Sequence, residues 1–174
     1  SSTAALGGQN EEQINEKTNW KQTPHTSAYA FSKYAAEKEV WRGIEEGLTA
    51  VIINPSIIFG SGSWDKSSLS IFRTVDNGLR FYTGGANGFV DARDLATIMI
   101  QLMESRIQNE RFVCVGENAS FYSLLSKIAN KLNKRPPNIF APDWLMGFAW
   151  RLSWVTAVIH RRRPTITKAS AHAS

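Results

Sequence analysis

The sequence contains one cysteine and three histidines, and these small numbers argue against two kinds of site. Cys114 cannot form a disulfide within the chain, and its apolar neighbours predict a buried strand, so a reducing compartment is expected. His25, His160 and His172 are far apart and lack the spacing of metal ligands. The sequence therefore predicts no metal site.

Long uninterrupted hydrophobic runs are also missing. The longest apolar region, residues 139–159, contains Asp143 and Arg151, so it predicts an amphipathic helix rather than a membrane-spanning one. The cluster from Arg161 to Arg163 follows, and binding of this helix to an anionic membrane surface is left as an alternative. The first residues lack the charged-then-apolar pattern of a secretory signal, and a cytoplasmic protein is expected.

Positively charged residues are only slightly more numerous than negatively charged ones. Lysine and arginine number 20, and aspartate and glutamate number 15, which gives a formal net charge of +5. Because the chain has no long basic stripe with interleaved aromatic residues, this balance does not indicate nucleic-acid binding. Of the 174 residues, 43% are hydrophobic, which is enough for one domain, or most of one, with its own core.

A tyrosine and a lysine four positions apart are the main chemical signal. Residues 27–46 predict one helix, because good helix formers dominate and Thr26 or Ser27 can cap it. Tyr29 and Lys33 then leave the same helix face, one turn apart. A free phenol has a pKa of about 10, and a nearby ammonium lowers that pKa toward the range of a general acid and base. The alternative is a tyrosine and a solvated lysine that share a face by chance.

Three further segments accompany this pair: residues 1–8, residues 47–60 and residues 88–96. They read SSTAALGG, GLTAVIINPSIIFG and GFVDARDLA. In their order and spacing, the four motifs resemble those of the extended short-chain dehydrogenase/reductases, the NAD-dependent epimerase/dehydratase family. The chain looks closest to the branch of dihydroflavonol reductases and 3β-hydroxysteroid dehydrogenases.

The resemblance implies an α/β fold, namely the C-terminal part of a Rossmann-type doubly wound parallel sheet with a small mixed α/β substrate-binding region. Residues 1–60 would end the dinucleotide-binding domain, with the catalytic helix and the sixth strand. Residues 61–174 would be mainly substrate-binding, while a helix at 94–105 and a strand at 111–115 return to the Rossmann sheet. Because no glycine-rich dinucleotide motif follows an apolar strand, the first strands are expected to lie outside this sequence. A complete protein of another fold is the alternative.

The resemblance also assigns catalytic roles to individual residues. Tyr29 would be the general acid and base, and Lys33 would tune its pKa and bind the nicotinamide ribose. Ser2 would hold the substrate oxygen, with Thr3 as the alternative if the positions are counted back from the second of the two following glycines. From the residues alone, either hydroxyl could equally be one that satisfies backbone groups.

Five residues are expected to bind the cofactor, which the resemblance gives as NAD or NADP. Tyr29 and Lys33 are two of them. Pro55 and Ile57 follow the sixth strand, at the edge of the sheet where ligands bind. Ser67 matches a position from which a hydroxyl can reach the pyrophosphate. The choice between NAD and NADP depends on a residue after the second strand, which this sequence does not contain.

The implied activity is nicotinamide-dependent oxidation, reduction or epimerisation at a secondary alcohol or ketone of a small molecule, either a nucleotide sugar or an apolar compound. Sugar dehydratases of the family place an Asp-Glu pair after the catalytic hydroxyl, so Ala4 and Ala5 argue against dehydration. A non-catalytic dinucleotide-binding sensor and a membrane-surface or partner-binding module are the competing functions. A homodimer is left open.

Hydrophobic periodicity and capping residues predict the remaining elements. They are a strand at 49–54 that is buried on both faces and ended by Pro55, a helix from Ser67 or Ser68 to 77, brief strands at 81–82 and 89–90, a helix capped by Asp94, a strand at 111–115, a helix from Ser120 to 132, and a last helix at 143–159.

Overall fold

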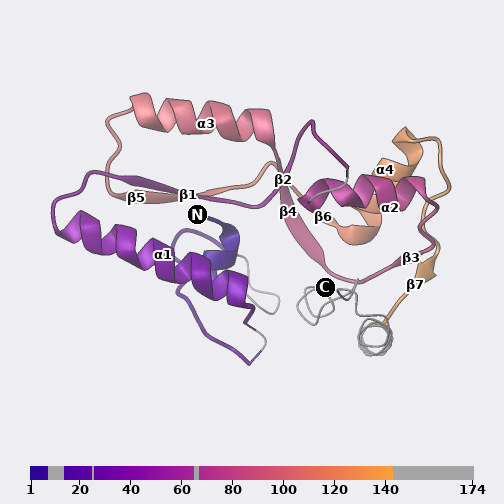
Figure 1. Ribbon diagram of the computed structural model, residues 1–174, viewed down its shortest axis with the longest axis horizontal. Helices are drawn as coiled ribbons and strands as arrows, with labels where there is room; N and C mark the ends of the chain where they lie inside the picture. The colour runs from indigo at the N-terminus through magenta and orange to yellow at the C-terminus, as the bar shows by residue number, and fades with distance from the viewer. Residues whose placement is uncertain (8–13, 25, 65–66, 143–174) are drawn as a thin grey trace, which may run out of the picture. The chain divides into compact units, whose positions relative to one another are not determined.

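The computed structural model describes residues 1–7, 14–24, 26–64 and 67–142. The chain divides into two compact units, and each of them is assembled from two separate segments (Figure 1). The first unit comprises residues 1–61 and 88–118, and the second comprises residues 62–87 and 119–174. The helix expected at 143–159 lies outside the described residues.

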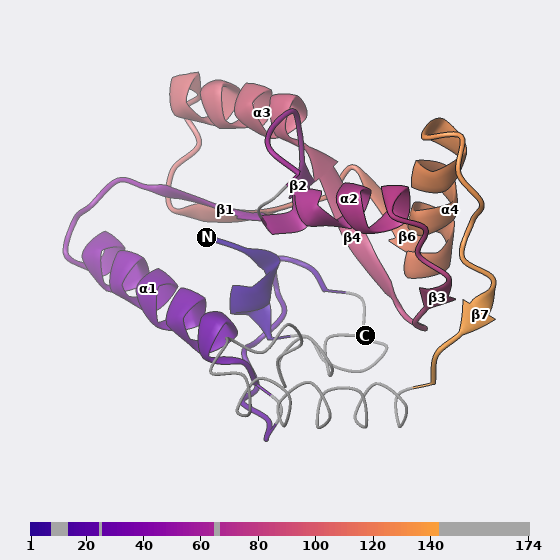
Figure 2. The same ribbon diagram turned by 45° about the vertical axis from the view of Figure 1, so that its right-hand side comes forward.

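The first unit is built on two parallel strands, β1 (Val51–Pro55) and β5 (Glu110–Cys114). Helix α1 (Ala28–Glu45) lies on one face of this strand pair and helix α3 (Ala92–Glu104) lies on the other, as the two views agree (Figures 1 and 2). Parallel strands joined through a crossover helix are the signature of an α/β fold. The predicted α/β class is therefore confirmed.

The prediction that the first of these strands is buried on both faces is wrong for alternate residues. Ile52 and Asn54 are buried, whereas Val51 and Ile53 are only half-buried. A sheet of two strands is too narrow for its covering helices to shield both faces completely. The strand also includes Pro55 as its last residue. A proline has no N–H to donate to the neighbouring strand, and this loss is tolerated at the end of a strand.

Helix α1 begins where the capping pattern predicts. The Ser27 hydroxyl accepts a hydrogen bond from the backbone N–H of Ala30 at 3.1 Å, so Ser27 rather than Thr26 is the N-cap. The short 3₁₀ helix η1 (Thr3–Leu6) packs against α1 and buries Ala5 and Leu6. Ser2, which directly precedes η1, has an extended backbone with φ of −164° and ψ of 153°.

Gly7 ends η1 in the left-handed conformation, with φ of 64°. A Cβ at this position would lie 2.8 Å from Cε3 of Trp20. We expect Gly7→Ala to destabilise the fold by about 2 kcal/mol, because it adds backbone strain to a steric collision. Chemical unfolding measures this. The cost should shrink in a Trp20→Leu background, and a neutral Gly7→Ala variant would contradict the collision.

A second sheet has the strand order β2 (Ile57–Phe59), β4 (Ala86–Asp91) and β6 (Glu117–Ser120), with β2 parallel to β4. Strands β2 and β6 were not predicted. The N–H of Ser56 still donates to the carbonyl of Cys114 in β5 at 3.0 Å, and the chain then pairs with a different strand, because Ile57 of β2 lies opposite Phe89 of β4. From the sequence alone, Pro55 predicts the end of the strand, because the partner strand β4 is distant in the chain.

Asp91, not Asp94, caps helix α3. The Asp91 carboxylate accepts from the backbone N–H of Arg93 at 2.8 Å, while Asp94 lies in the first turn. Arg93 also donates from Nε and Nη2 to the same carboxylate, at 3.0 and 2.8 Å. These hydrogen bonds from Arg93 lower the pKa of Asp91 to about 2. Arg93 is thus engaged with the cap of its own helix.

The second unit pairs two helices, α2 (Ser70–Asp76) and α4 (Phe121–Lys131), and two short parallel strands, β3 (Phe81–Tyr82) and β7 (Ile139–Phe140). Its core is formed by residues of the two helices, namely Val75, Leu125, Ile128 and Ala129. In the part of the chain that the structure describes, no helix is both long and apolar enough to cross a membrane.

Serine residues were predicted to cap both helices of this unit, and the prediction holds for only one of them. Ser120 caps α4 as predicted, because its hydroxyl accepts from the N–H of Ser123 at 3.1 Å. Neither Ser67 nor Ser68 caps α2. Both belong to a preceding 3₁₀ turn, η2 (Ser67–Leu69), so that Leu69 holds the cap position without a side-chain hydrogen bond.

Candidate active site

Tyr29 and Lys33 lie on the first two turns of α1 and face the same way. The ammonium of Lys33 is 5.6 Å from the centre of the Tyr29 ring, which is within the range of a cation–π contact. Tyr29 is 57% exposed, while Lys33 is half-buried. The shared helix face that the spacing predicts is present, and the catalytic roles of both residues stay predictions.

Ser2 lies directly before η1, and its backbone is held at the carboxyl end of β1. The amide nitrogen of Asn54, which precedes the last residue of β1, donates to the Ser2 carbonyl at 2.9 Å. The Ser2 hydroxyl accepts from the N–H of Ala4 at 3.2 Å and so caps the turn. Thr3 is the first residue of that turn. The cap accounts for the Ser2 hydroxyl locally, and a role for Ser2 or Thr3 in catalysis stays a prediction.

The expected cofactor residues fall in both units. Pro55 lies at the carboxyl end of β1 and Ile57 is the first residue of β2, and both are half-buried. The backbone approaches closely here, because a Cβ on Gly88 would lie 3.0 Å from that of Ser56. Ser67 begins η2 in the second unit, and its side chain lies outside the described part of the structure. The roles of Pro55, Ile57 and Ser67 are not decided by these positions.

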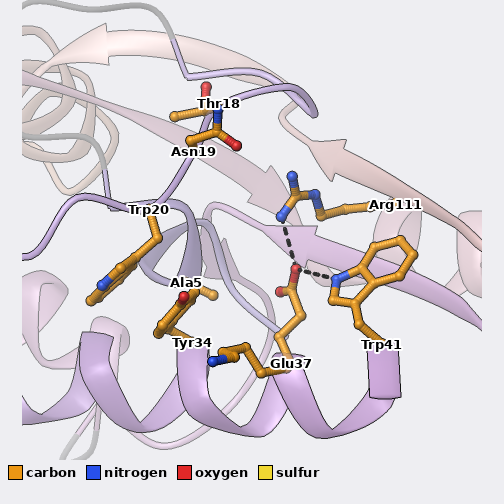
Figure 3. Close-up of a pocket in the computed structure, with 9 residues that line it drawn as sticks. Ala5, Thr18, Asn19, Trp20, Tyr34, Glu37, Trp41 and Arg111 are labelled. Carbon is orange, nitrogen blue, oxygen red and sulfur yellow. Dashed lines mark hydrogen bonds and ion pairs between the residues drawn. The ribbon is translucent and has the colours of Figure 1, made fainter. Parts of the chain in front are cut away.

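A buried carboxylate that the sequence analysis missed lies two turns beyond Tyr29 on α1. Glu37 is 5% exposed and forms an ion pair with Arg111 of β5, with 2.9 Å between Oε1 and Nη1 (Figure 3). It also accepts hydrogen bonds from Ser1 Oγ at 2.6 Å, Asn54 Nδ2 at 2.8 Å and Trp41 Nε1 at 3.4 Å. Burial by itself raises the pKa of Glu37, but these hydrogen bonds hold it below its ordinary value.

The signal for Glu37 was present in the sequence. Tyr29, Lys33 and Glu37 are spaced by four, so all three lie along one helix face. Without knowledge of its tertiary partners, a glutamate at that position of a helix is predicted to be exposed to solvent.

A cavity of about 250 Å³ opens beside this carboxylate and is distinct from the predicted catalytic residues. Figure 3 shows the rings of Trp20 and Tyr34 along one side of it. The two rings are stacked, with 4.4 Å between their centres. The cavity is lined by Ala5, Thr18, Asn19, Trp20, Tyr34, Glu37, Lys38, Trp41 and Arg111. Among the side chains that the structure describes, none of those predicted for catalysis or cofactor binding lines it.

The chain is similar in sequence to curated proteins of greater length. It is 27% identical over 122 residues to the sterol demethylase protein B of Methylococcus capsulatus, which covers 68% of this chain and 37% of that protein. It is 30% identical over 112 residues to tetraketide alpha-pyrone reductase 2 of Arabidopsis thaliana, which covers 62% of this chain and 35% of the reductase. The chain therefore spans about a third of the length of these relatives.

A solved structure supports the fold assignment. The crystal structure of gox2253 superposes with a TM-score of 0.75 at 26% identity, covering 98% of this chain and 53% of that one. The chain thus has part of a Rossmann-type fold, as the resemblance implies. Residues 1–116 match the model of the NAD dependent epimerase/dehydratase family. The matched region includes helix α1, β1 and β5. The chain belongs to the NAD dependent epimerase/dehydratase family.

Proposed function

We propose that this chain carries the catalytic part of an NAD- or NADP-dependent oxidoreductase or epimerase that acts on a secondary alcohol or ketone. The observation that carries the proposal is the exposed Tyr29 ring with the Lys33 ammonium 5.6 Å from its centre. A phenol beside a fixed cation can pass a proton to or from an alcohol oxygen. A lone structural tyrosine has no need of that arrangement.

The residues at the carboxyl end of β1 fit the nicotinamide part of the cofactor. Two buried polar atoms flank Pro55, the Asn54 Oδ1 and the Ser56 Oγ, and among the described residues neither has a hydrogen-bond partner. Buried polar atoms normally have partners, so these two suit a polar ligand group. A glycine-rich turn for the pyrophosphate is not part of this sequence, and the fit is limited to the nicotinamide side.

The roles of the chain's residues then follow. When bound, NAD or NADP supplies or accepts the hydride. In the oxidation direction, the Tyr29 oxygen takes the proton of the carbinol hydroxyl, and in reduction it returns that proton to the forming alkoxide. Lys33 keeps positive charge beside the phenol throughout. The Ser2 hydroxyl would hold the substrate oxygen by donating its O–H, since only a lone pair of this hydroxyl is used in accepting from the Ala4 N–H.

Among substrates, we favour an apolar or aromatic ketone over a nucleotide sugar. The two characterised relatives are named for a sterol and for a tetraketide pyrone. Dehydration is not proposed, because Ala4 and Ala5 cannot serve as the additional acid and base. A non-catalytic dinucleotide sensor is the second candidate, and it would keep the cofactor site without needing Tyr29. A cytoplasmic location stays a prediction, and a homodimer and a membrane-surface role stay alternatives.

The test uses the product of the natural reading frame that contains this chain. It is mixed with NADH or NADPH and a panel of a steroid ketone, a dihydroflavonol and a nucleotide-linked ketosugar, and the nicotinamide absorbance is followed. We expect oxidation of the reduced cofactor with an apolar ketone. Cofactor binding without turnover of any ketone would favour the sensor.

A separate prediction concerns the 174-residue chain by itself. We expect calorimetric titration with NAD and NADP to show no measurable binding, because no glycine-rich turn cradles the pyrophosphate. Binding in the micromolar range would show that the chain has its own phosphate site. The interpretation of these residues as the later strands of the fold would then be wrong.

A further inference from the structure

The buried carboxylate of Glu37 connects the two segments that carry the predicted catalytic groups. One segment is α1, which bears Tyr29 and Lys33 on the same face as Glu37. The other is the chain start, where the Ser1 hydroxyl donates to Glu37 Oε2 at 2.6 Å. A charge-assisted hydrogen bond of this length is among the stronger contacts between side chains. The segment of Ser2 is thereby tied directly to the helix of Tyr29.

Asn54 provides a second tie between the same two segments. Its amide nitrogen donates to Glu37 Oε2 at 2.8 Å and to the Ser2 carbonyl at 2.9 Å. Asn54 is 0% exposed and lies at the carboxyl end of β1, next to the predicted cofactor residue Pro55. The amide group of Asn54 therefore links the end of β1 to both α1 and the Ser2 backbone.

Two further contacts set the orientation of the carboxylate itself. Arg111 of β5 pairs with Oε1 at 2.9 Å, and the indole N–H of Trp41 donates to the same oxygen at 3.4 Å. Both oxygens of Glu37 are thus engaged, each by more than one donor. A buried charge held in this way permits few rotations of the helix, since any other rotation would leave the charge without its partners.

From these contacts we propose that Glu37 is a positioning residue of the active site, a role that rests on the proposed function. Its carboxylate sets the rotation of α1 about its own axis and the placement of the Ser1–Ser2 segment. It thereby determines where Tyr29 and Lys33 stand relative to Ser2. Glu37 touches neither substrate nor cofactor in this role, and it acts through the groups that it holds.

A purely structural role would give a different result in kinetics. Loss of a stabilising contact lowers the fraction of folded enzyme, whereas misplacement of reacting groups lowers kcat of the folded enzyme. In the enzyme from the natural reading frame, we expect Glu37→Gln to lower kcat by about 10- to 100-fold per folded molecule. The KM values for ketone and cofactor should change by less than about threefold, because the groups that bind them remain.

Glu39→Gln is the matched control. Glu39 lies two positions further along the same helix, is 63% exposed and pairs with Arg42 at 2.8 Å, so its loss should leave kcat and KM unchanged. Ser1→Ala serves as a milder variant if Glu37→Gln fails to fold, because it removes only one donor. We expect Ser1→Ala to lower kcat by about threefold or more, with KM nearly constant. Unchanged kcat in a folded Glu37→Gln variant, or in Ser1→Ala if only that variant folds, would overturn the proposal.

A second measurement separates this proposal from the proposed function. In the ¹⁵N-labelled 174-residue chain, the amide resonances of Ser2 and Lys33 should shift in Glu37→Gln, or in Ser1→Ala if Glu37→Gln does not fold, and stay in place in Glu39→Gln. If the enzyme turns over no ketone but these resonances shift together, the proposed reaction is wrong and the positioning role is supported. If neither resonance moves, Glu37 does not position these segments, whatever the reaction.

Discussion

Tyr29→Phe is expected to lower kcat by about 10²- to 10⁴-fold in the enzyme from the natural reading frame. The substitution keeps the ring and removes only the oxygen that carries the proton. Cofactor affinity should stay within a few-fold, because the ring still fills its place. Steady-state kinetics and calorimetry with NAD or NADP measure the two effects separately.

Two companion variants make this prediction specific. Tyr34→Phe is the matched control: Tyr34 lies on the same helix, but its ring stacks on Trp20 beside the cavity, so turnover should be unchanged. Lys33→Met should weaken both turnover and cofactor binding, because the ammonium is lost from the phenol and from the ribose. Near-normal turnover of the Tyr29→Phe variant with the natural substrate would show that another group moves the proton.

Arg111→Met is expected to destabilise the fold by about 3 kcal/mol, because it leaves the buried carboxylate of Glu37 without its ion-pair partner. The Arg111 side chain is 20% exposed and that of Glu37 is 4% exposed, so solvent can replace little of the lost interaction. Chemical unfolding of the 174-residue chain measures the change. A loss below about 0.5 kcal/mol would mean that the pair contributes no more than a surface salt bridge.

The same pair predicts how stability depends on pH. The pKa of Glu37 is lowered in the folded state, so its contribution to stability is complete above the unfolded pKa and is lost as the pH falls through the folded one. Glu16 behaves alike, because the backbone N–H of Val113 donates to its carboxylate and lowers its pKa. The free energy of unfolding should therefore fall in acid. Glu37→Gln should be less stable at neutral pH and should show a shallower fall, whereas Glu39→Gln should follow the unaltered chain.

The local elements of this fold could be predicted from the sequence because their causes lie within a few residues. Helix α1 follows from its cap and its helix formers, and the meeting of Tyr29 with Lys33 follows from a spacing of four. The apolar runs that became β1 and β5 were also visible. The family resemblance rested on the same short motifs, and it is confirmed for residues 1–116.

Contacts between distant segments could not be predicted in this way. Strand β2 was missed because its partner β4 is distant in the sequence, and Asp91 caps α3 because the chain leaves β4 at that residue. Helix α2 begins later than its serines suggest, since a 3₁₀ turn comes first. In each case the competing local signal was real, and a tertiary contact or a neighbouring element decided the outcome.

Glu37 shows both what the sequence determines and what only the tertiary structure determines. The sequence determines that its side chain leaves α1 on the face of Tyr29 and Lys33, because helix geometry alone requires it. Only the tertiary structure brings Ser1, Asn54 and Arg111 to it, from positions 36, 17 and 74 residues away. A carboxylate with those three donors can be buried as a charge, whereas the same residue without them would have to stay in water.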